Sequence, residues 1–236
     1  MALTVRLYSF LLLVLLSFSA KEKGTTNRII LFKPTFNNQE LVLEKGSYFT
    51  NNNDTISVTH FKFYISNLRV EFENGSNFAD PEKVHLVDAE WPESMELKLH
   101  EVPNLKVKKV IFQVGIDSVT NVSTHFEGDL DPKLGMYWAW NSGYINMKLE
   151  GKSNSCTSLK KDFQFHIGGY LPKQNALQTV QIPVQDQANS IEIKVDISEW
   201  LRHIKLSETS GLMVPGEKAV AMSHWYTNMF SSDEKE

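Results

Sequence analysis

Cysteine is almost absent from this sequence. The 236 residues contain one cysteine, Cys156, so the chain cannot form an internal disulfide. A chain of this length buries enough apolar surface to fold without covalent cross-links. Cys156 lies in the polar stretch KSNSCTS, with no histidine near it in the sequence. We therefore expect an exposed thiol that is not a nucleophile, in a protein held together by packing alone.

An excess of basic residues is also missing. Lys and Arg together number 24 against 28 Asp and Glu, which gives a formal net charge of −4. The basic residues do not gather into a patch, and a basic patch is what nucleic-acid binding requires. The remaining composition, 42% hydrophobic and 22% charged, is typical of a soluble globular protein. The composition therefore argues against a nucleic-acid partner.

The common catalytic signatures are absent too. There is no G-x-S-x-G, P-loop, G-x-G-x-x-G or H-E-x-x-H pattern. The acidic stretch EGDLDPKLG carries Glu127, Asp129 and Asp131, but it lacks the Gly and Glu positions of an EF-hand loop. A hydrolase built on these carboxylates would have no nucleophile or oxyanion motif beside them. We expect a polar turn here, and a binding protein in place of an enzyme.

Only one long apolar run is present, and it lies at the N-terminus. Arg6 is followed by LYSFLLLVLLSFSA. Its core of about 12 apolar residues is shorter than the ~20 that a membrane span needs. A basic residue, an apolar run and small residues in this order are typical of a secretory signal peptide. Ser17 and Ser19 predict cleavage after Ser19, so residues 1–19 are the expected signal peptide and 20–236 the mature domain. The protein is then exported, periplasmic or extracellular, with no membrane span after cleavage.

Alternating apolar and polar residues dominate the mature chain. In ISVTHFKFYISNLRVEF, residues 56–72, period two puts Val58 and His60 on one face and Phe61 on the other. Turn signals separate this segment from further strands, as in antiparallel all-β folds. Those strands are expected at Arg28–Pro34, Lys83–Asp88, Met95–Val102, Leu105–Gly115, Tyr144–Gly151, Lys161–Gly169, Ala176–Val184 and Ser190–Ile197.

Two short helices are expected near the C-terminus. Ser198 can cap the segment EWLRHI, and EKAVAMSHWYTNMF follows Pro215 and Gly216. No internal repeat and no linker divides the chain. The sequence therefore predicts one all-β domain, an antiparallel β-sandwich with long loops and one or two short C-terminal helices. The longest irregular region, residues 116–143, is of a length that is more often functional than accidental.

Histidines are the first candidate ligands. His60, His85 and His166 lie in predicted strands, and His125 lies in the long irregular region. His166 alternates with Phe165, so it faces away from the apolar side of its strand. Imidazole nitrogens suit copper or zinc. Sequence spacing alone does not define a metal site here.

The aromatic stretch GMYWAWNSGYI, residues 135–145, holds two of the five tryptophans. If it is extended, Trp138 and Trp140 share a side with Met136. Three interpretations are open: plain core, which the residue chemistry favours by itself, oxidisable indoles, or an exposed platform for a glycan or peptide. The rings of that platform would be Tyr137, Trp138, Trp140 and Tyr144.

Four motifs carry a family resemblance. FYISNLRV (63–70), VGIDS (114–118), GDLDPKLGMYWAWNSGYINMKLEG (128–151) and FHIGGY (165–170) occur in this order. Together they resemble the MbnP-like copper-binding family, whose members are related to proteins encoded beside methanobactin genes. The resemblance covers nearly all of the mature chain. It implies a secreted or periplasmic β-sandwich that binds copper and serves in copper acquisition or handling.

The same resemblance implies a modified tryptophan. In some members a partner di-haem enzyme, of the MauG and cytochrome c peroxidase type, oxidises a tryptophan to kynurenine. The kynurenine amine then binds copper together with histidines. Indole itself is a poor ligand because its nitrogen lone pair belongs to the ring, whereas the opened ring carries an aniline nitrogen. The matching positions are Trp138 or Trp140 for the indole and His166 for the best-matched imidazole.

Four further residues are candidate ligands. His125, His85 and His60 are included because of motif proximity and strand facing, and Met136 because a soft thioether suits Cu(I). The alternative function is an exported β-sandwich module that binds a glycan, a peptide or a protein on its aromatic platform.

Overall fold

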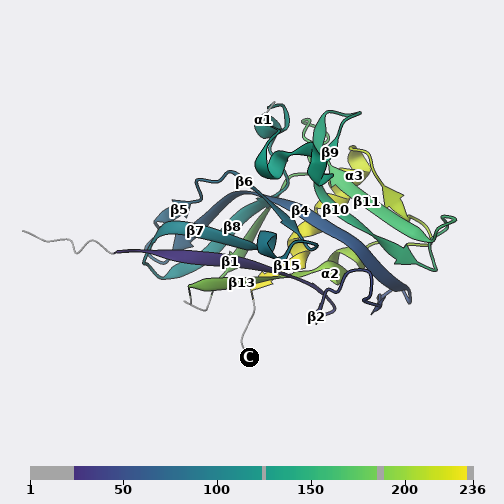
Figure 1. The fold of residues 1–236 in the computed structure, drawn as a ribbon, viewed down its shortest axis with the longest axis horizontal. Coiled ribbons are helices and arrows are strands. Elements are labelled where there is room, and N and C mark those ends of the chain that lie inside the picture. Colours follow the sequence, from purple (N-terminus) through teal and green to yellow (C-terminus); the bar gives the residue numbers. More distant parts are fainter. Residues whose placement is uncertain (1–23, 124–125, 185–188, 233–236) are drawn as a thin grey trace, which may run out of the picture.

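Two β-sheets packed face to face form the body of the protein (Figure 1). The structure is a computed structural model and describes residues 24–123, 126–184 and 189–232. The predicted signal peptide and His125 lie outside these residues. Within them, no helix is long and apolar enough to cross a membrane. The all-β sandwich expected from the alternation pattern is confirmed.

The smaller sheet has β1 at its centre. Strand β13 pairs with one edge of β1 in parallel, and β7 and β2 pair antiparallel with it. Strand β15 closes the sheet beside β13. The parallel pair departs from the purely antiparallel arrangement that turn spacing predicted. The bounds are β1 Thr25–Phe36, β2 Gln39–Glu40, β7 Glu96–Pro103, β13 Ser190–Asp196 and β15 Phe230–Ser232.

The larger sheet is built on the 18-residue strand β4, Thr55–Phe72. Its strand order is β12–β8–β4–β10–β11–β14, with β3, β5 and β6 also paired to β4, and β9 to β10. The other bounds are β3 Tyr48–Phe49, β5 Asn77–Ala79, β6 Val84–Asp88, β8 Val107–Val114, β9 Tyr137–Trp138, β10 Gly143–Ser153, β11 Asp162–Gly168, β12 Gln178–Pro183 and β14 Gly211–Leu212.

Strand β4 does not keep a single alternation. The register with β10 shifts between Glu150, which pairs with His60, and Gly151, which pairs with Val58. The extra residue turns Val58 into the core, where it is fully buried, while His60 stays on the outer face. The prediction that Val58 and His60 share a face is therefore wrong, because a β-bulge inserts one residue and reverses the facing beyond it.

The helices are short. They are α1 Ser118–Asn121, α2 Ile197–Leu201 and α3 Glu217–Ser223, with 3-10 turns η1 Pro92–Met95, η2 Gly128–Leu130, η3 Pro132–Leu134 and η4 Tyr226–Met229. The two helices predicted near the C-terminus are present. However, α2 is capped by Asp196, whose side chain accepts from the Ser198 amide, so the predicted cap residue lies inside the helix.

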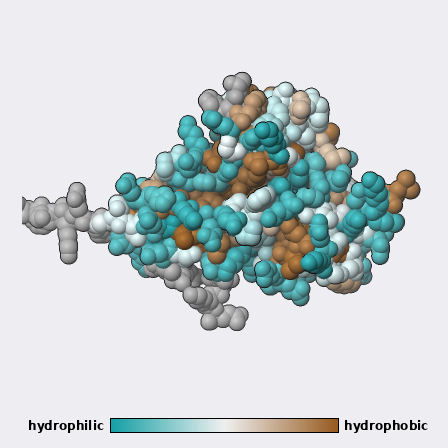
Figure 2. Space-filling view, viewed as in Figure 1, coloured by the Kyte–Doolittle hydropathy of each residue, from teal (hydrophilic) through white to brown (hydrophobic). Residues whose placement is uncertain are grey.

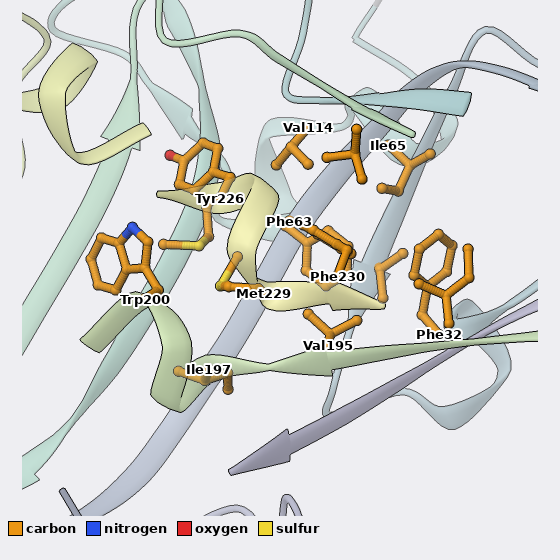
Figure 3. Packing of buried hydrophobic residues seen from close by; sticks show 14 of the residues in the cluster. Phe32, Phe63, Ile65, Val114, Val195, Ile197, Trp200, Tyr226, Met229 and Phe230 are labelled. Atoms are coloured by element: carbon orange, nitrogen blue, oxygen red, sulfur yellow. The ribbon is translucent and has the colours of Figure 1, made fainter. Parts of the chain in front are cut away.

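The main core lies between the two sheets and is rich in phenylalanine. Phe32 from β1, Phe63 from β4 and Phe230 from β15 meet edge to face (Figure 3), with ring centroids 5.7 to 6.4 Å apart. Such edge-to-face pairs add stability beyond the area that they bury. The face of the molecule seen in Figure 2 is mostly hydrophilic, with separate apolar areas.

Cys156 belongs to this core. Its exposed fraction is 0%, and burial raises the pKa of its thiol. The prediction of an exposed thiol is wrong because the turn after β10 folds inward, with the Cys156 amide donating to the Ser153 carbonyl. The polar neighbours in the sequence gave no sign of this.

Candidate functional site

A second apolar cluster lies on the outer face of the larger sheet, away from the main core. The region between α1 and β10 folds back over this face, and α1 and β9 stand together at one end of the sheet (Figure 1). We call this group the outer cluster; its members are Tyr64, Leu86, Ile116, Met136, Trp138, Tyr144 and Ile145. Most of the aromatic stretch is therefore buried, but in this small cluster and not in the main core.

Hydrogen bonds tie the GDLDP turn to the sheet. The Tyr64 hydroxyl donates to the Asp129 carbonyl at 2.9 Å, and the Tyr144 hydroxyl donates to the Leu130 carbonyl at 3.0 Å. The Leu86 amide donates to the Asp129 carboxylate at 2.7 Å, and Asp131 accepts from the amide two residues on at 2.9 Å. These carboxylates bind backbone amides, which is a structural role in the turn.

Two buried asparagines hold the other end of this region. Asn121 accepts from the Tyr144 amide at 2.9 Å and donates to the Ile116 carbonyl at 2.8 Å. Asn146 accepts from the Ile116 amide at 3.2 Å and packs against Gly115, where a Cβ would lie 2.3 Å from its side chain. The sequence interpretation missed both residues. An asparagine inside an apolar strand, as in GYINMKL, is the signal that could have revealed Asn146.

Trp138 lies directly against strand β11. It is 5% exposed, and a Cβ added to Gly168 would lie 3.0 and 3.1 Å from its Cζ3 and Cη2 atoms. Gly168 follows His166 by two residues, so the two share a face about 6.6 Å apart along the strand. This contact relates the WAW and HIGG motifs physically: Gly168 makes room for the Trp138 indole on the strand that carries His166.

Trp140 has a different environment from Trp138. It is 64% exposed, and its ring centroid lies 6.0 Å from that of Trp138. The chain turns directly after β9, where the Asn141 amide donates to the Trp138 carbonyl. The extended alternation ends after β9, which spans only two residues, so Met136 and Trp138 are buried whereas Trp140 is exposed.

A row of imidazoles and carboxylates crosses the outer face beside the outer cluster. His166 Nε2 lies 2.6 Å from Glu150 Oε1, and His60 Nδ1 lies 3.4 Å from Glu150 Oε2. His60 Nε2 lies 3.6 Å from Glu90. Strands β4, β10 and β11 are adjacent, so one glutamate on the middle strand reaches both histidines. We call His60, Glu90, Glu150 and His166 the imidazole row; the sequence interpretation missed its two glutamates.

The hydrogen bond from His166 holds the pKa of Glu150 below its usual range, although partial burial opposes this. A glutamate whose folded-state pKa is depressed stabilises the fold above its unfolded pKa of about 4.3, and this contribution disappears as pH falls through the folded-state pKa. We expect Glu150→Gln to reduce the loss of stability between pH 7 and pH 3, as measured by urea unfolding. Glu192→Gln, at an exposed ion pair, is the control. If the free energy of unfolding of Glu150→Gln fell with pH as much as that of wild type, the stabilising role of ionised Glu150 would be contradicted.

Two lysines flank the row. Lys62 binds Asp88 at 2.8 Å and Glu90 at 3.0 Å. Lys148, opposite both Lys62 and His166 in the sheet, donates to the Gly135 carbonyl at the start of the aromatic stretch. Burial lowers the pKa of Lys148. This lysine therefore connects the aromatic stretch to the imidazole row.

The remaining predicted ligands lie apart from the row. His85 is paired with Asp80 at 2.6 Å and sits opposite Ile65, on the other face of the sheet from His60. Met136 is fully buried in the outer cluster. Of the described residues, no three His, Cys, Asp or Glu side chains are arranged to hold a metal ion by themselves.

The predicted aromatic platform is largely covered. Tyr144 and Trp138 are 1% and 5% exposed, and Tyr137 is half-buried between Tyr144 and Phe126. Of the four rings, Trp140 alone is freely accessible. A single ring offers little area for stacking on a ligand.

Comparisons with known proteins agree on one family. The family model described as MbnP matches residues 25–215. Among solved structures, MbnP from Methylosinus trichosporium aligns with a TM-score of 0.60 and 13% identity, over 80% of this chain and 83% of that chain. At this identity the structural likeness shows the fold alone. No curated protein matches the chain.

Proposed function

Because the chain belongs to the MbnP family, we propose that it is an exported copper-binding protein that acquires or handles copper and is not an enzyme. The observation that carries this proposal is the convergence of His60 and His166 on Glu150. Neutral imidazole is a good copper ligand. A metal-binding histidine usually donates its other ring N–H to a carboxylate, and the bond between His166 and Glu150 is of this kind.

The residues present fit a copper site that needs one further donor. Two imidazoles lie in the row, but no third His, Cys, Asp or Glu of the described chain completes a set with them. Kynurenine would supply an amine where the unmodified indole offers only an N–H donor. We propose that a MauG-like di-haem cytochrome c peroxidase oxidises Trp138 or Trp140 to kynurenine, and that this amine joins His60 and His166. His60, His166 and this amine would together offer copper three nitrogen ligands.

The burial of the other candidates restricts the ligand set. Met136 is packed inside the outer cluster, and His85 is held by Asp80 on the opposite face. We therefore omit both from the proposed site. Glu150 is assigned to orienting the two imidazoles.

Copper content and intact mass test this proposal. The protein purified from its native host should carry copper, and one tryptophan should have lost a carbon and gained an oxygen. His60→Ala and His166→Ala should lose the copper, and Glu150→Gln should bind it about 10- to 100-fold more weakly. His100→Ala, at an exposed position on β7, is the matched control. Full copper loading in a His60→Ala, His166→Ala double variant would disprove the site.

An exported module that binds a glycan, peptide or protein is the second candidate function. Its one supporting observation is the 64% exposure of Trp140. On this alternative, Trp140→Ala would abolish ligand binding and His166→Ala would leave it unchanged. Loss of metal in His166→Ala favours the copper-binding function.

A further inference from the structure

The two tryptophans of the aromatic stretch differ in what surrounds them. Trp140 is 64% exposed, whereas Trp138 is 5% exposed. Their ring centroids are 6.0 Å apart, with the planes inclined at 48°. Electron transfer weakens exponentially with distance, so two rings this close exchange an electron far faster than either does with a distant group. An oxidant outside the protein therefore reaches Trp138 most directly through Trp140.

We propose that Trp140 is the relay that passes electrons to an external one-electron oxidant, and that Trp138 is the residue that is oxygenated. This inference rests on the proposed function, because it assigns roles to the two indoles that the function leaves interchangeable. Trp140 is thus a relay residue at the surface, and Trp138 is the group that reacts.

The surroundings of the two N–H groups support this division. An indole that loses one electron becomes a strong acid at its nitrogen. At Trp140 surrounding water accepts that proton, and the neutral radical that remains is reduced again. Trp138 Nε1 is buried without a hydrogen-bond partner among the described residues. The radical cation of Trp138 therefore keeps its proton, and its positive charge makes ring carbon C2 open to attack by water.

Trp138 gives up four electrons, one at a time through Trp140, to high-valent haem iron, which is reduced by one electron in each step. Two water molecules supply two oxygen atoms to C2 and C3 and release four protons, and the bond between C2 and C3 breaks. The product is N-formylkynurenine. A further water then cleaves the bond from the formyl carbon to nitrogen, which releases formate and leaves the aromatic amine.

Two neighbouring tyrosines, Tyr64 and Tyr144, do not intercept the oxidation. Tyr137 lies 5.0 Å from Tyr144, and Tyr144 lies 5.7 Å from Tyr64, measured between ring centroids. A phenol loses an electron readily only when a base takes its proton. The Tyr64 and Tyr144 hydroxyls donate to backbone carbonyls, which are weak bases, and burial raises the pKa of Tyr144 to about 12. The oxidation therefore does not pass to Tyr64 or Tyr144.

A photochemical oxidant tests the relay without copper or a haem partner. The purified chain is illuminated with a ruthenium(II) polypyridyl complex and a sacrificial electron acceptor, which together generate ruthenium(III) as the one-electron oxidant. The complex is too large to enter the outer cluster, and oxygenated residues are located by peptide mass mapping. Wild type should accumulate N-formylkynurenine or kynurenine at Trp138. Trp140→Phe should slow this about tenfold or more. Trp91→Phe is the matched control, since Trp91 is also 64% exposed, and it should leave the rate at Trp138 unchanged.

Three results would overturn the inference. They are oxygenation at Trp140 with Trp138 intact, a wild-type rate at Trp138 in Trp140→Phe, and an equal slowing in Trp91→Phe. Thermal unfolding of each variant verifies that the fold is retained. The outcome is separate from that of the proposed function: a protein that binds no copper can still show the relay, and a copper protein can lack it.

Discussion

Replacing Gly168 with alanine is expected to displace the Trp138 indole and to lower the free energy of unfolding by about 1–3 kcal/mol. The added Cβ would lie 2.6 Å from the Tyr144 carbonyl oxygen and 3.0 Å from the Trp138 ring. Both neighbours belong to the outer cluster or its backbone, and close-packed surroundings cannot yield without loss of contacts. The tryptophan emission should shift to longer wavelength as Trp138 becomes hydrated.

Gly24→Ala is the matched control, because nothing lies within 4 Å of a Cβ at that position. It should leave both the emission and the urea midpoint unchanged. If Gly168→Ala behaved like the control, the close contact between Trp138 and β11 would be wrong. The proposed copper site would then lose the contact that places the Trp138 indole against the strand that carries His166.

Replacing Asp196 with alanine should lower the free energy of unfolding by about 3 kcal/mol and the Tm by roughly 6–12 °C. The carboxylate is 7% exposed. It accepts from the Asn37, Asn38 and Ser198 amides, each at 3.0 Å, and from the Ser198 hydroxyl at 2.6 Å. It thereby joins the start of α2 to the β1–β2 turn, where Asn37 and Asn38 both have positive φ.

Urea denaturation measures this loss, and Glu192→Ala on the same strand is the control. Glu192 forms a surface ion pair with Lys33, and such pairs contribute about 1 kcal/mol or less. Asp196→Asn keeps one acceptor oxygen and should fall between the two variants. Equal unfolding midpoints for Asp196→Ala and Glu192→Ala would show that the buried hydrogen bonds do not stabilise the turn.

Strand positions and the all-β class could be predicted because hydrophobic alternation is a local property of the chain. The segment from Ile56 to Phe72 was identified as a strand, and it forms the longest strand of the larger sheet. The outward facing of His166 is also confirmed, since its neighbours Phe165 and Ile167 are fully buried. Bulges, by contrast, depend on the partner strand, so the reversal at Val58 was not visible in the sequence.

Burial of single residues was harder to predict where the chain turns. Cys156 has polar neighbours in the sequence but is packed in the core. Trp140 is two residues after Trp138, the spacing of one face of a strand, but it is exposed. In both cases the direction of a turn, and not the local composition, decides which side chain enters the protein. Turns are fixed by hydrogen bonds to distant segments, such as the one from the Tyr144 amide to Asn121 and the one from the Tyr144 hydroxyl to Leu130.

The sequence by itself determined the fold class and, through four ordered motifs, the family. These features depend on alternation and on residue identity along the chain. Only the tertiary structure decided which side chains meet. Glu150 joins His60 to His166 because β10 lies between β4 and β11, and Trp138 packs against β11 because Gly168 has no side chain. Strand order and close contact are properties of three dimensions, so no period in the sequence encodes them.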